Sequence, residues 1–417
     1  MTAASNTSYD ALLKEVWPQD DIYDELFDLN ESFFAMVPKD TGFTEKFRHI
    51  AVGTSHTQGL SASFSQAKAN QAPTVQKEFK ISPVTYYSFF QIQRQLLKRS
   101  KSNKAAILSA LDREPRSAIY GWKRVNGIYL GNLSGFGDLG RLASFTGAVL
   151  TFAGDASFVT KHFEQGMTLE LSVDNTGVAG VRVSASPLRI ISVDREGGTV
   201  TCNQSIAAAI PAAGQTDYVY RAGDYAAVVS GVYAWCPIAT PTATLFFGLD
   251  RTSEPQRLGG WRVNTKNLSQ RGALKKTLKV LKENGANPTH AFYSPNDFLN
   301  LQMEIESSGV LKTVKEPGAM INKYKFGMPF EGIEVMGPAG PVKVMFDINM
   351  QDNYPLVTQL STWTYASMGD VPYFDEQDGN RILRETDADA YGGRIIGDGQ
   401  LYTECPGYSA INLLRGS

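Results

Sequence analysis

Cysteine and histidine are both scarce in this 417-residue chain, which holds three cysteines and four histidines. Cys202, Cys236 and Cys405 are odd in number and far apart, whereas a disulfide framework needs an even and dense set. This favours a reducing compartment. Zinc sites need several ligands that converge, and the histidines form no cluster with one another or with a cysteine. We therefore expect neither a metal nor any other cofactor.

The chain also lacks an excess of charge of either sign. Lys and Arg total 40 against 42 Asp and Glu, which gives a formal net charge of −2. Dedicated readers of DNA sequence are usually basic, so this class is disfavoured, whereas loose contact with packaged nucleic acid is not. Neither an apolar run of about 18 residues nor a signal-peptide pattern is found. We expect a protein that is neither secreted through a signal peptide nor embedded in a membrane.

Catalytic motifs are sparse. The segment Gly135-Phe136-Gly137-Asp138-Leu139-Gly140 matches the glycine pattern of a dinucleotide-binding loop. That loop needs a strand before it and a helix after it, but here a helix is predicted before it and strand-like residues 145–152 follow. The acidic turn from Asp387 breaks the calcium-loop spacing at Tyr391. A nucleotide-dependent enzyme is thus a minor alternative, and we expect no enzyme.

What the sequence does contain is a pair of strand-like arms, residues 43–52 and 75–90. In the second arm Val75, Lys77, Phe79 and Ile81 alternate with polar residues. The 22 residues between the arms, 53–74, are rich in Ser, Gly, Ala and Gln. An isolated two-stranded ribbon is only marginally stable and its edges invite pairing. We therefore expect the ribbon to need a partner surface, such as a neighbouring copy of the chain.

The remaining pattern predicts an α+β protein of two or three structural units. Residues 104–130 have the apolar spacing of a long helix that contains Pro115. Residues 166–229 hold short strands at close spacing, which predicts a small barrel or sandwich. Helix and strand then alternate, with helices expected at 268–283 and from Pro295 onward. The tail from Asp375 mixes turns with short strand-like pieces.

One basic run stands out, because Asp112 and Glu114 are the sole acidic residues between Arg94 and Arg124. The favoured interpretation is a solvated helix face, and the alternative is a surface for phosphates or acidic neighbours. In that alternative the candidate interior basic surface comprises Arg94, Lys98, Arg99, Lys101 and Lys104.

The order of these parts resembles the major capsid proteins of tailed bacteriophages, with the Hong Kong ninety-seven type of fold. The resemblance covers nearly the whole chain, in the order of its parts and in the character of the local sequence. The segments that carry it are Phe33-Phe34-Ala35-Met36-Val37-Pro38-Lys39, Gly59-Leu60-Ser61-Ala62-Ser63-Phe64, Gly127-Ile128-Tyr129-Leu130-Gly131-Asn132, Phe247-Gly248-Leu249-Asp250-Arg251 and Ser294-Pro295-Asn296-Asp297-Phe298.

This resemblance implies a division of the chain into six parts and a set of residues that meet neighbouring subunits. The parts are an N-terminal arm (1–40), an extended loop (41–92), a peripheral domain with a spine helix (93–160), an inserted small β-barrel-like domain (161–240), an axial domain (241–365) and a C-terminal return to the peripheral domain (366–417). The expected assembly-interface residues are Phe33, Phe34, Phe43, Phe47, Phe64, Lys68 and Phe79.

The function implied is a self-assembling major capsid protein that forms hexamers and pentamers of an icosahedral shell around double-stranded DNA. The virion is its expected location, after assembly in the host cytoplasm. Because only about 40 residues precede the ribbon, the resemblance implies a separate scaffolding protein. A portal, a decoration protein and non-specific contact with packaged DNA are the other expected partners. An encapsulin-like protein compartment is the alternative among structural proteins.

Overall fold

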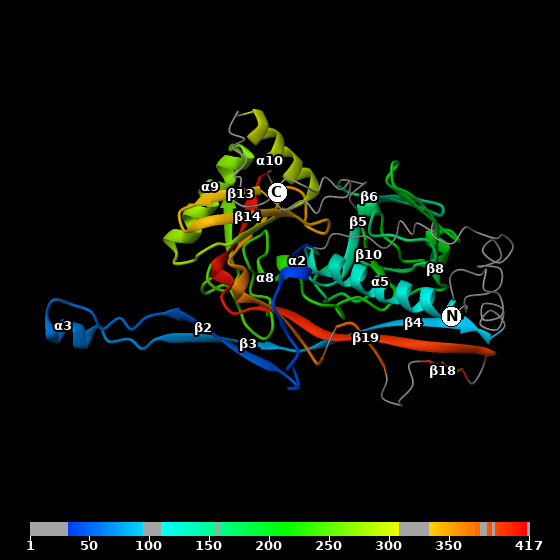
Figure 1. Cartoon of the computed structure of the whole chain (residues 1–417), viewed down its shortest axis with the longest axis horizontal. Coiled ribbons are helices and arrows are strands. Elements are labelled where there is room, and N and C mark those ends of the chain that lie inside the picture. Colours follow the sequence, from blue (N-terminus) through cyan, green and yellow to red (C-terminus); the bar gives the residue numbers. More distant parts are fainter. Residues whose placement is uncertain are drawn as a thin grey trace, which may run out of the picture.

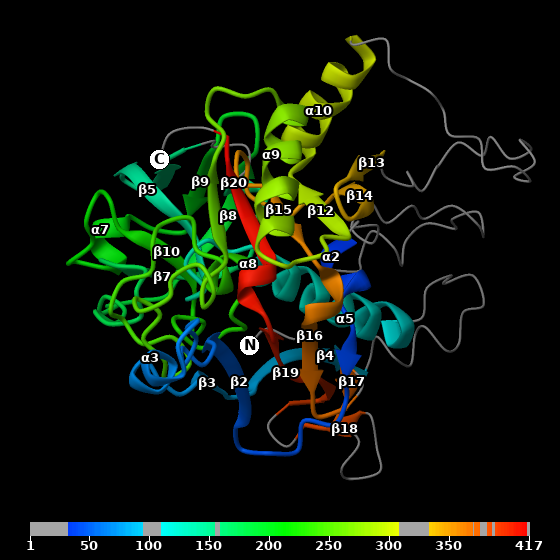
Figure 2. The same ribbon diagram turned by 90° about the vertical axis from the view of Figure 1, so that its left-hand side faces the viewer.

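The computed structural model describes residues 32–94, 110–154, 159–307, 333–369, 371–375, 382–385 and 388–414. A long layer of strands forms the base of the molecule, an α/β unit and a barrel stand on it, and a ribbon projects from one end (Figure 1). Seen along the ribbon, the barrel strands lie on one side and helices α2 (Ser32–Met36) and α5 (Ala110–Leu130) on the other (Figure 2). Among the described residues, none of the helices has the length and apolar character needed to span a membrane.

The base layer is built around β19 (Ala390–Thr403), a strand of 14 residues. All ten residues of strand β4 (Val84–Gln93) pair antiparallel with residues 390–399 of β19. The sequence predicted only short strand-like pieces here, and that prediction is wrong. The long strand was not recognisable because several glycines interrupt the apolar alternation. The other strands of this sheet are β1 (Lys39–Asp40), β16 (Trp363–Ser367), β17 (Tyr373–Phe374) and β18 (Leu383–Arg384).

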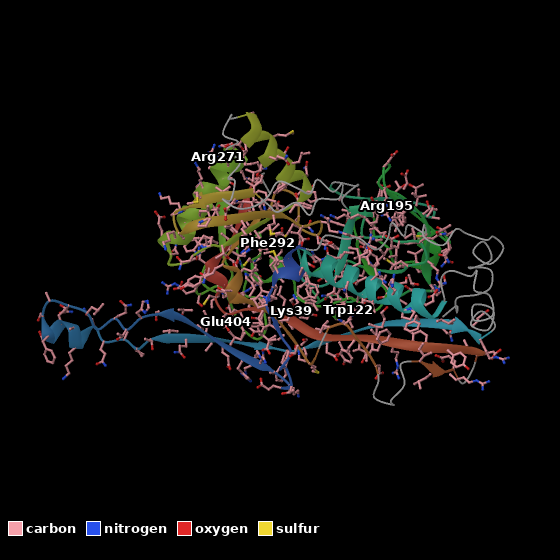
Figure 3. All side chains as sticks on the ribbon, in the orientation of Figure 1. Lys39, Trp122, Arg195, Arg271, Phe292 and Glu404 are labelled. Carbon is pink, nitrogen blue, oxygen red and sulfur yellow. The ribbon has the colours of Figure 1, made fainter. Side chains whose placement is uncertain are left out.

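Helix α5 (Ala110–Leu130) covers one face of the β4–β19 pair. The predicted apolar stripe is confirmed at Ala118, Trp122, Val125 and Tyr129, all of which are buried. Residues 104–109 and the Leu111 side chain lie outside the described part. Trp122 points at the base layer (Figure 3) and donates its indole N–H to the Tyr86 carbonyl at 3.1 Å.

The predicted small β domain is a closed antiparallel barrel in the order β10-β5-β6-β9-β8-β7. Its boundary at residue 161 is wrong, because two barrel strands come earlier in the chain. Closure pairs both edges of every strand and leaves none free. The strands are β5 (Asp138–Thr146), β6 (Val149–Phe152), β7 (Thr168–Ser172), β8 (Leu188–Asp194), β9 (Thr199–Cys202) and β10 (Tyr218–Arg221). The short helix α7 (Ile206–Ala209) lies between β9 and β10, and α8 (Val232–Trp235) follows β10.

The α/β unit is a six-stranded sheet with helices α9 (Gln270–Glu283) and α10 (Pro295–Ser307) packed on it. Helix α9 is capped by Ser269, whose Oγ accepts the Gly272 N–H at 3.2 Å. One strand comes from the C-terminal segment, so the prediction that residues 366–417 return only to the peripheral part is wrong. In order the strands are β11 (Trp261–Asn264), β20 (Ser409–Leu413), β15 (Leu356–Thr358), β12 (His290–Tyr293), β14 (Gly340–Phe346) and β13 (Ile333–Gly337), and the short 3₁₀ turns Leu360–Thr362 and Pro406–Tyr408 flank β16 and β20.

Buried polar groups join the barrel to the base layer. The Asp224 carboxylate accepts the hydroxyl of Tyr86 at 2.9 Å and also that of Tyr129 on α5. Nearby, the ring of His162 is buried, with Nδ1 3.1 Å from the Leu139 carbonyl oxygen. Burial lowers the pKa of His162 from 6.5 to about 3, and the neighbouring Lys161 charge adds to the effect.

We predict that adding one methyl group at Gly397 destabilises the fold. A Cβ there would lie 1.9 Å from Cζ2 of Trp122, so β19 or α5 would have to move. Gly397→Ala should lower the free energy of unfolding by about 1–3 kcal/mol in chemical denaturation. Gly121→Ala is the matched control, because its Cβ meets nothing within 4 Å. It should leave stability unchanged or raise it by about 0.5–1 kcal/mol, and an equal loss in both variants would contradict the packing account.

A second prediction concerns acid. Since the folded-state pKa of His162 lies below its unfolded value, its contribution to stability is present above about pH 6.5 and is lost as the pH falls toward 3. The wild type should therefore lose more free energy of unfolding between about pH 7 and pH 4.5 than His162→Gln, which cannot titrate. The carboxylates contribute equally to the pH dependence of both proteins, so the difference between the two reports His162. Equal pH dependence would show that His162 does not become charged on unfolding.

Candidate assembly interface

The root of the ribbon is an antiparallel pair, β2 (Arg48–Ser55) and β3 (Val75–Ile81). Its inner face carries buried side chains that belong to the largest hydrophobic cluster of the subunit: Ile50, Val52, Phe79 and Ile81. Phe79 packs edge-on against Trp235, with ring centroids 5.1 Å apart. The ribbon root is therefore covered by its own subunit, and the expectation that the whole ribbon needs a neighbour is wrong for this part.

Backbone hydrogen bonds fix the root as well. The Lys80 N–H donates to the Phe247 carbonyl at 2.9 Å, and the Arg257 guanidinium donates to the Thr54 carbonyl. The predicted second arm, 75–90, is not one strand, because it breaks before Pro83 and continues as β4 in the base layer. The extended loop thus ends near residue 82, where proline cannot donate a ladder hydrogen bond, and not at 92.

The tip of the ribbon, defined here as residues 56–74, differs from the root because it is almost wholly exposed. It contains the short helix α3 (Phe64–Ala69), which has no buried residue. Two of its apolar side chains are strongly exposed, Leu60 at 74% and Phe64 at 85%. Lys68 is exposed too. The tip extends beyond the body of the molecule (Figure 1), so nothing else in the described chain covers it.

Three of the predicted interface residues are buried within the subunit. Phe33, Phe43 and Phe79 are 2%, 0% and 0% exposed and lie in the core of the subunit itself. Side chains buried to this degree leave almost no surface for a second subunit to contact. Phe47, by contrast, is 41% exposed at the start of the ribbon, and Phe34 is half-buried.

The end of the predicted N-terminal arm docks on the same subunit. In α2 (Ser32–Met36), the Phe33 ring packs edge-on against Phe292 at 5.2 Å and Trp363 at 5.8 Å. The Phe33 N–H donates to Asp347 Oδ2 at 2.8 Å, and burial raises the pKa of this carboxyl. Residues 1–31 of the arm lie outside the described part.

The candidate interior basic surface is described at only one of its residues. Arg94 Nε is paired with Asp389, at 2.7 Å from Oδ1 and 3.0 Å from Oδ2. Lys98, Arg99, Lys101 and Lys104 lie outside the described residues. The one described cation is thus matched by a carboxylate and offers little free charge to a polyanion.

The glycine segment 135–140 is a connection between a helix and a strand, which is the context that the sequence predicted for it. It follows α5 and runs into β5, with no helix after it. Asn132 Oδ1 accepts the N–H groups of Ser134 and Gly135, at 2.8 and 3.0 Å. A Cβ on Gly135 would lie 2.4 Å from that of Ala234. The segment is therefore packed against its own chain and leaves no open cradle of N–H groups for phosphate.

Two cavities of about 660 and 940 Å³ lie beside β2, between the ribbon and the body. Ala51 and Cys405 line both of them, and His56, Arg257 and Glu404 add mixed charge. In the described part of the chain, His, Cys, Asp and Glu form no group of three that could hold a metal ion. Neither cavity assembles a recognisable catalytic set, and their main effect is to leave the outer part of β2 loosely covered.

Comparison with known proteins gives structural similarity alone. No family model matches the sequence, and no curated protein matches it. A subunit of the Cyanophage A-1(L) capsid matches with a TM-score of 0.53 at 12% identity, covering 99% of both chains. The capsid of a native GTA particle (TM-score 0.47, 8% identity, 100% of both chains) and the SrpI encapsulin of Synechococcus elongatus (0.45, 8%, 100% of this chain and 96% of that one) also match.

The cyanophage match carries the assignment, since it spans both chains from end to end at a TM-score above 0.5. The base layer, the spine helix α5, the α/β unit and the projecting ribbon are the parts that the sequence resemblance anticipated. The chain has the α+β fold of phage capsid proteins, with a small closed β-barrel inserted in it.

Proposed function

We propose that this protein is the major subunit of an icosahedral capsid that assembles from hexamers and pentamers and packages double-stranded DNA. The observation that carries the proposal is the ribbon tip, which holds Leu60 and Phe64 outside the subunit on a root that is firmly anchored in it. Such side chains lose exposed apolar area only when another molecule covers them. The capsid fold supports another copy of the chain as that molecule.

The tip also favours closed rings over isolated pairs. In the proposed assembly the tip meets a different surface of the next copy, which is a heterologous contact, and such contacts generate rings when the rotation closes. Rings of five and six are the units that an icosahedral shell needs. A scaffolding protein, a portal and a decoration protein are the further partners of this proposal, and its role is structural, with no reaction to catalyse.

An encapsulin-like compartment is the second candidate, favoured by the end-to-end coverage of an encapsulin subunit. The content of the particles separates the two. Electron microscopy of the full chain, expressed with its scaffold, should show shells or capsomers, and nuclease-protected DNA should be recovered from mature particles. Shells that never protect DNA would favour the compartment, whereas monomers at high concentration with scaffold present would contradict both.

One pair of substitutions separates the root of the ribbon from its tip. Phe79→Ala removes a ring from the core and should cost about 3–5 kcal/mol of unfolding free energy. Phe64→Ala removes a ring that is 85% exposed and should change subunit stability by less than about 0.5 kcal/mol. Phe64→Ala should nevertheless impair assembly, as followed by light scattering or microscopy. Normal assembly of Phe64→Ala would remove the tip from the interface.

A shortened ribbon tests the tip as a whole. Replacing residues 56–74 by an Asn-Gly turn joins Ser55 to Val75, which are paired in the β2–β3 register. The shortened subunit should keep its circular dichroism spectrum and cooperative unfolding, because the tip contributes no residue to the core. It should assemble poorly. Loss of folding would mean that the tip supports its own subunit, against the proposal.

A further inference from the structure

Helix α9 and the strand before it concentrate positive charge. From Arg262 to Lys282 the chain has seven cationic residues and no acidic one, although the formal net charge of the whole chain is −2. Arg262 is used internally, since its guanidinium donates to three backbone carbonyls. The others face outward along α9 or just before it, and they are Lys266, Arg271, Lys275, Lys276, Lys279 and Lys282.

The four lysines of α9 are poorly neutralised. Lys276 and Lys282 donate to neutral acceptors, the Asn264 carbonyl and Asn287 Oδ1, each at 2.7 Å. Lys279 lies 3.5 Å from Glu283, but both side chains are mostly exposed, so water screens the pair. Hydrogen bonds to neutral groups hold an ammonium in place without cancelling its charge. The helix therefore presents a fixed basic face, which we call the α9 basic face (Lys275, Lys276, Lys279 and Lys282).

Folding of the subunit explains the apolar, buried face of α9, but it does not explain why the exposed face is positively charged. Leu274, Leu278 and Leu281 are buried on the sheet, and the outward positions need only be polar. The first turn of α9 contains Arg271 and no acidic residue of its own, and the Arg271 N–H donates to Glu304 Oε2 of α10 at 3.1 Å. Helix α10, next to it, follows the usual rule with Asp297 in its first turn. Four outward lysines on one helix are more than folding requires, which indicates a role outside the subunit's own fold.

The residue type points to the partner. Lysine is depleted in protein–protein interfaces, where ordering its long side chain is costly, whereas it is a common point-charge ligand for phosphate. Along a 14-residue helix of about 21 Å, four lysines can meet successive phosphates of a duplex without reading its bases. Arg271, in the first turn of α9, lies at the end of the α/β unit away from the ribbon (Figure 3), whereas Glu283 at the other end of the helix lines the cavity beside β2.

We propose that the α9 basic face binds the phosphate backbone of duplex DNA without sequence preference. This rests on the proposed function, because a packaged duplex would be the polyanion that it meets. This surface is distinct from the predicted basic surface at residues 94–104, and its charges lie on one described and well-packed helix.

The test is salt-dependent binding of a fluorescent random-sequence duplex to the full chain, kept unassembled and followed by anisotropy. Each lysine–phosphate contact contributes about −0.9 to the slope of log affinity against log salt. The variant Lys275→Gln, Lys276→Gln, Lys279→Gln, Lys282→Gln should reduce the magnitude of the slope by about 3–4 and weaken binding at least about tenfold at low salt. Circular dichroism checks that it folds, since all four side chains are exposed.

The control removes the same charge elsewhere, with Lys46→Gln, Lys77→Gln, Lys80→Gln and Lys343→Gln. The salt slope of this control should differ from that of the wild type by no more than about 0.9, the contribution of one phosphate contact. An unchanged slope in the α9 variant, or equal losses in both variants, overturns the inference. Unchanged DNA binding with impaired capsomer formation would also overturn it, because the α9 basic face would then meet a second copy. Shell formation by the wild type is scored separately by microscopy, so failure of the shell proposal is seen apart from failure of this one.

Discussion

Trp235 connects the parts on which the candidate interface depends. Its ring is fully buried and packs against Phe79 of the ribbon, Phe246 at 5.0 Å and Phe247 at 5.4 Å. Its indole N–H donates to the Leu401 carbonyl of β19 at 2.9 Å. One side chain thus joins the ribbon root to the longest strand of the base layer. Because the root cannot move without exposing these rings, the tip is held at a defined place outside the subunit.

This arrangement divides the ribbon into two energetically different parts. The root gains its stability from apolar burial within the subunit, where each large ring contributes roughly 1.5–3 kcal/mol. The tip gains none, and its apolar side chains can be covered only on association. A subunit built in this way can fold alone and still carry an unsatisfied surface for assembly, which is what a shell protein requires.

Much of this fold could be predicted from the sequence where local patterns are strong. The 3.6-residue period of Leu274, Leu278 and Leu281 predicted α9, and the short strands at close spacing predicted the barrel. The length of β19 could not be predicted, because glycines that make room for Trp122 and Tyr365 remove its alternation.

The interface was harder to predict than the fold, because alternation shows that a strand has two faces but not what covers each one. Phe79 and Phe64 are equally apolar in the sequence, and only tertiary contact distinguishes the buried ring from the exposed one. The signal available for the tip was composition: Leu60 and Phe64 stand alone in a stretch of small and polar residues that cannot bury them.

Hydrogen exchange, measured by mass spectrometry on free subunits and on assembled shells, tests the central claim most directly. In free subunits the amides of β2 and β3 should be protected, and those of residues 56–74 should exchange rapidly. In shells the tip amides should become protected while the root changes little. Tip amides that stay unprotected after assembly, or a root that is protected only in shells, would contradict a ribbon anchored in its own subunit and covered by the next.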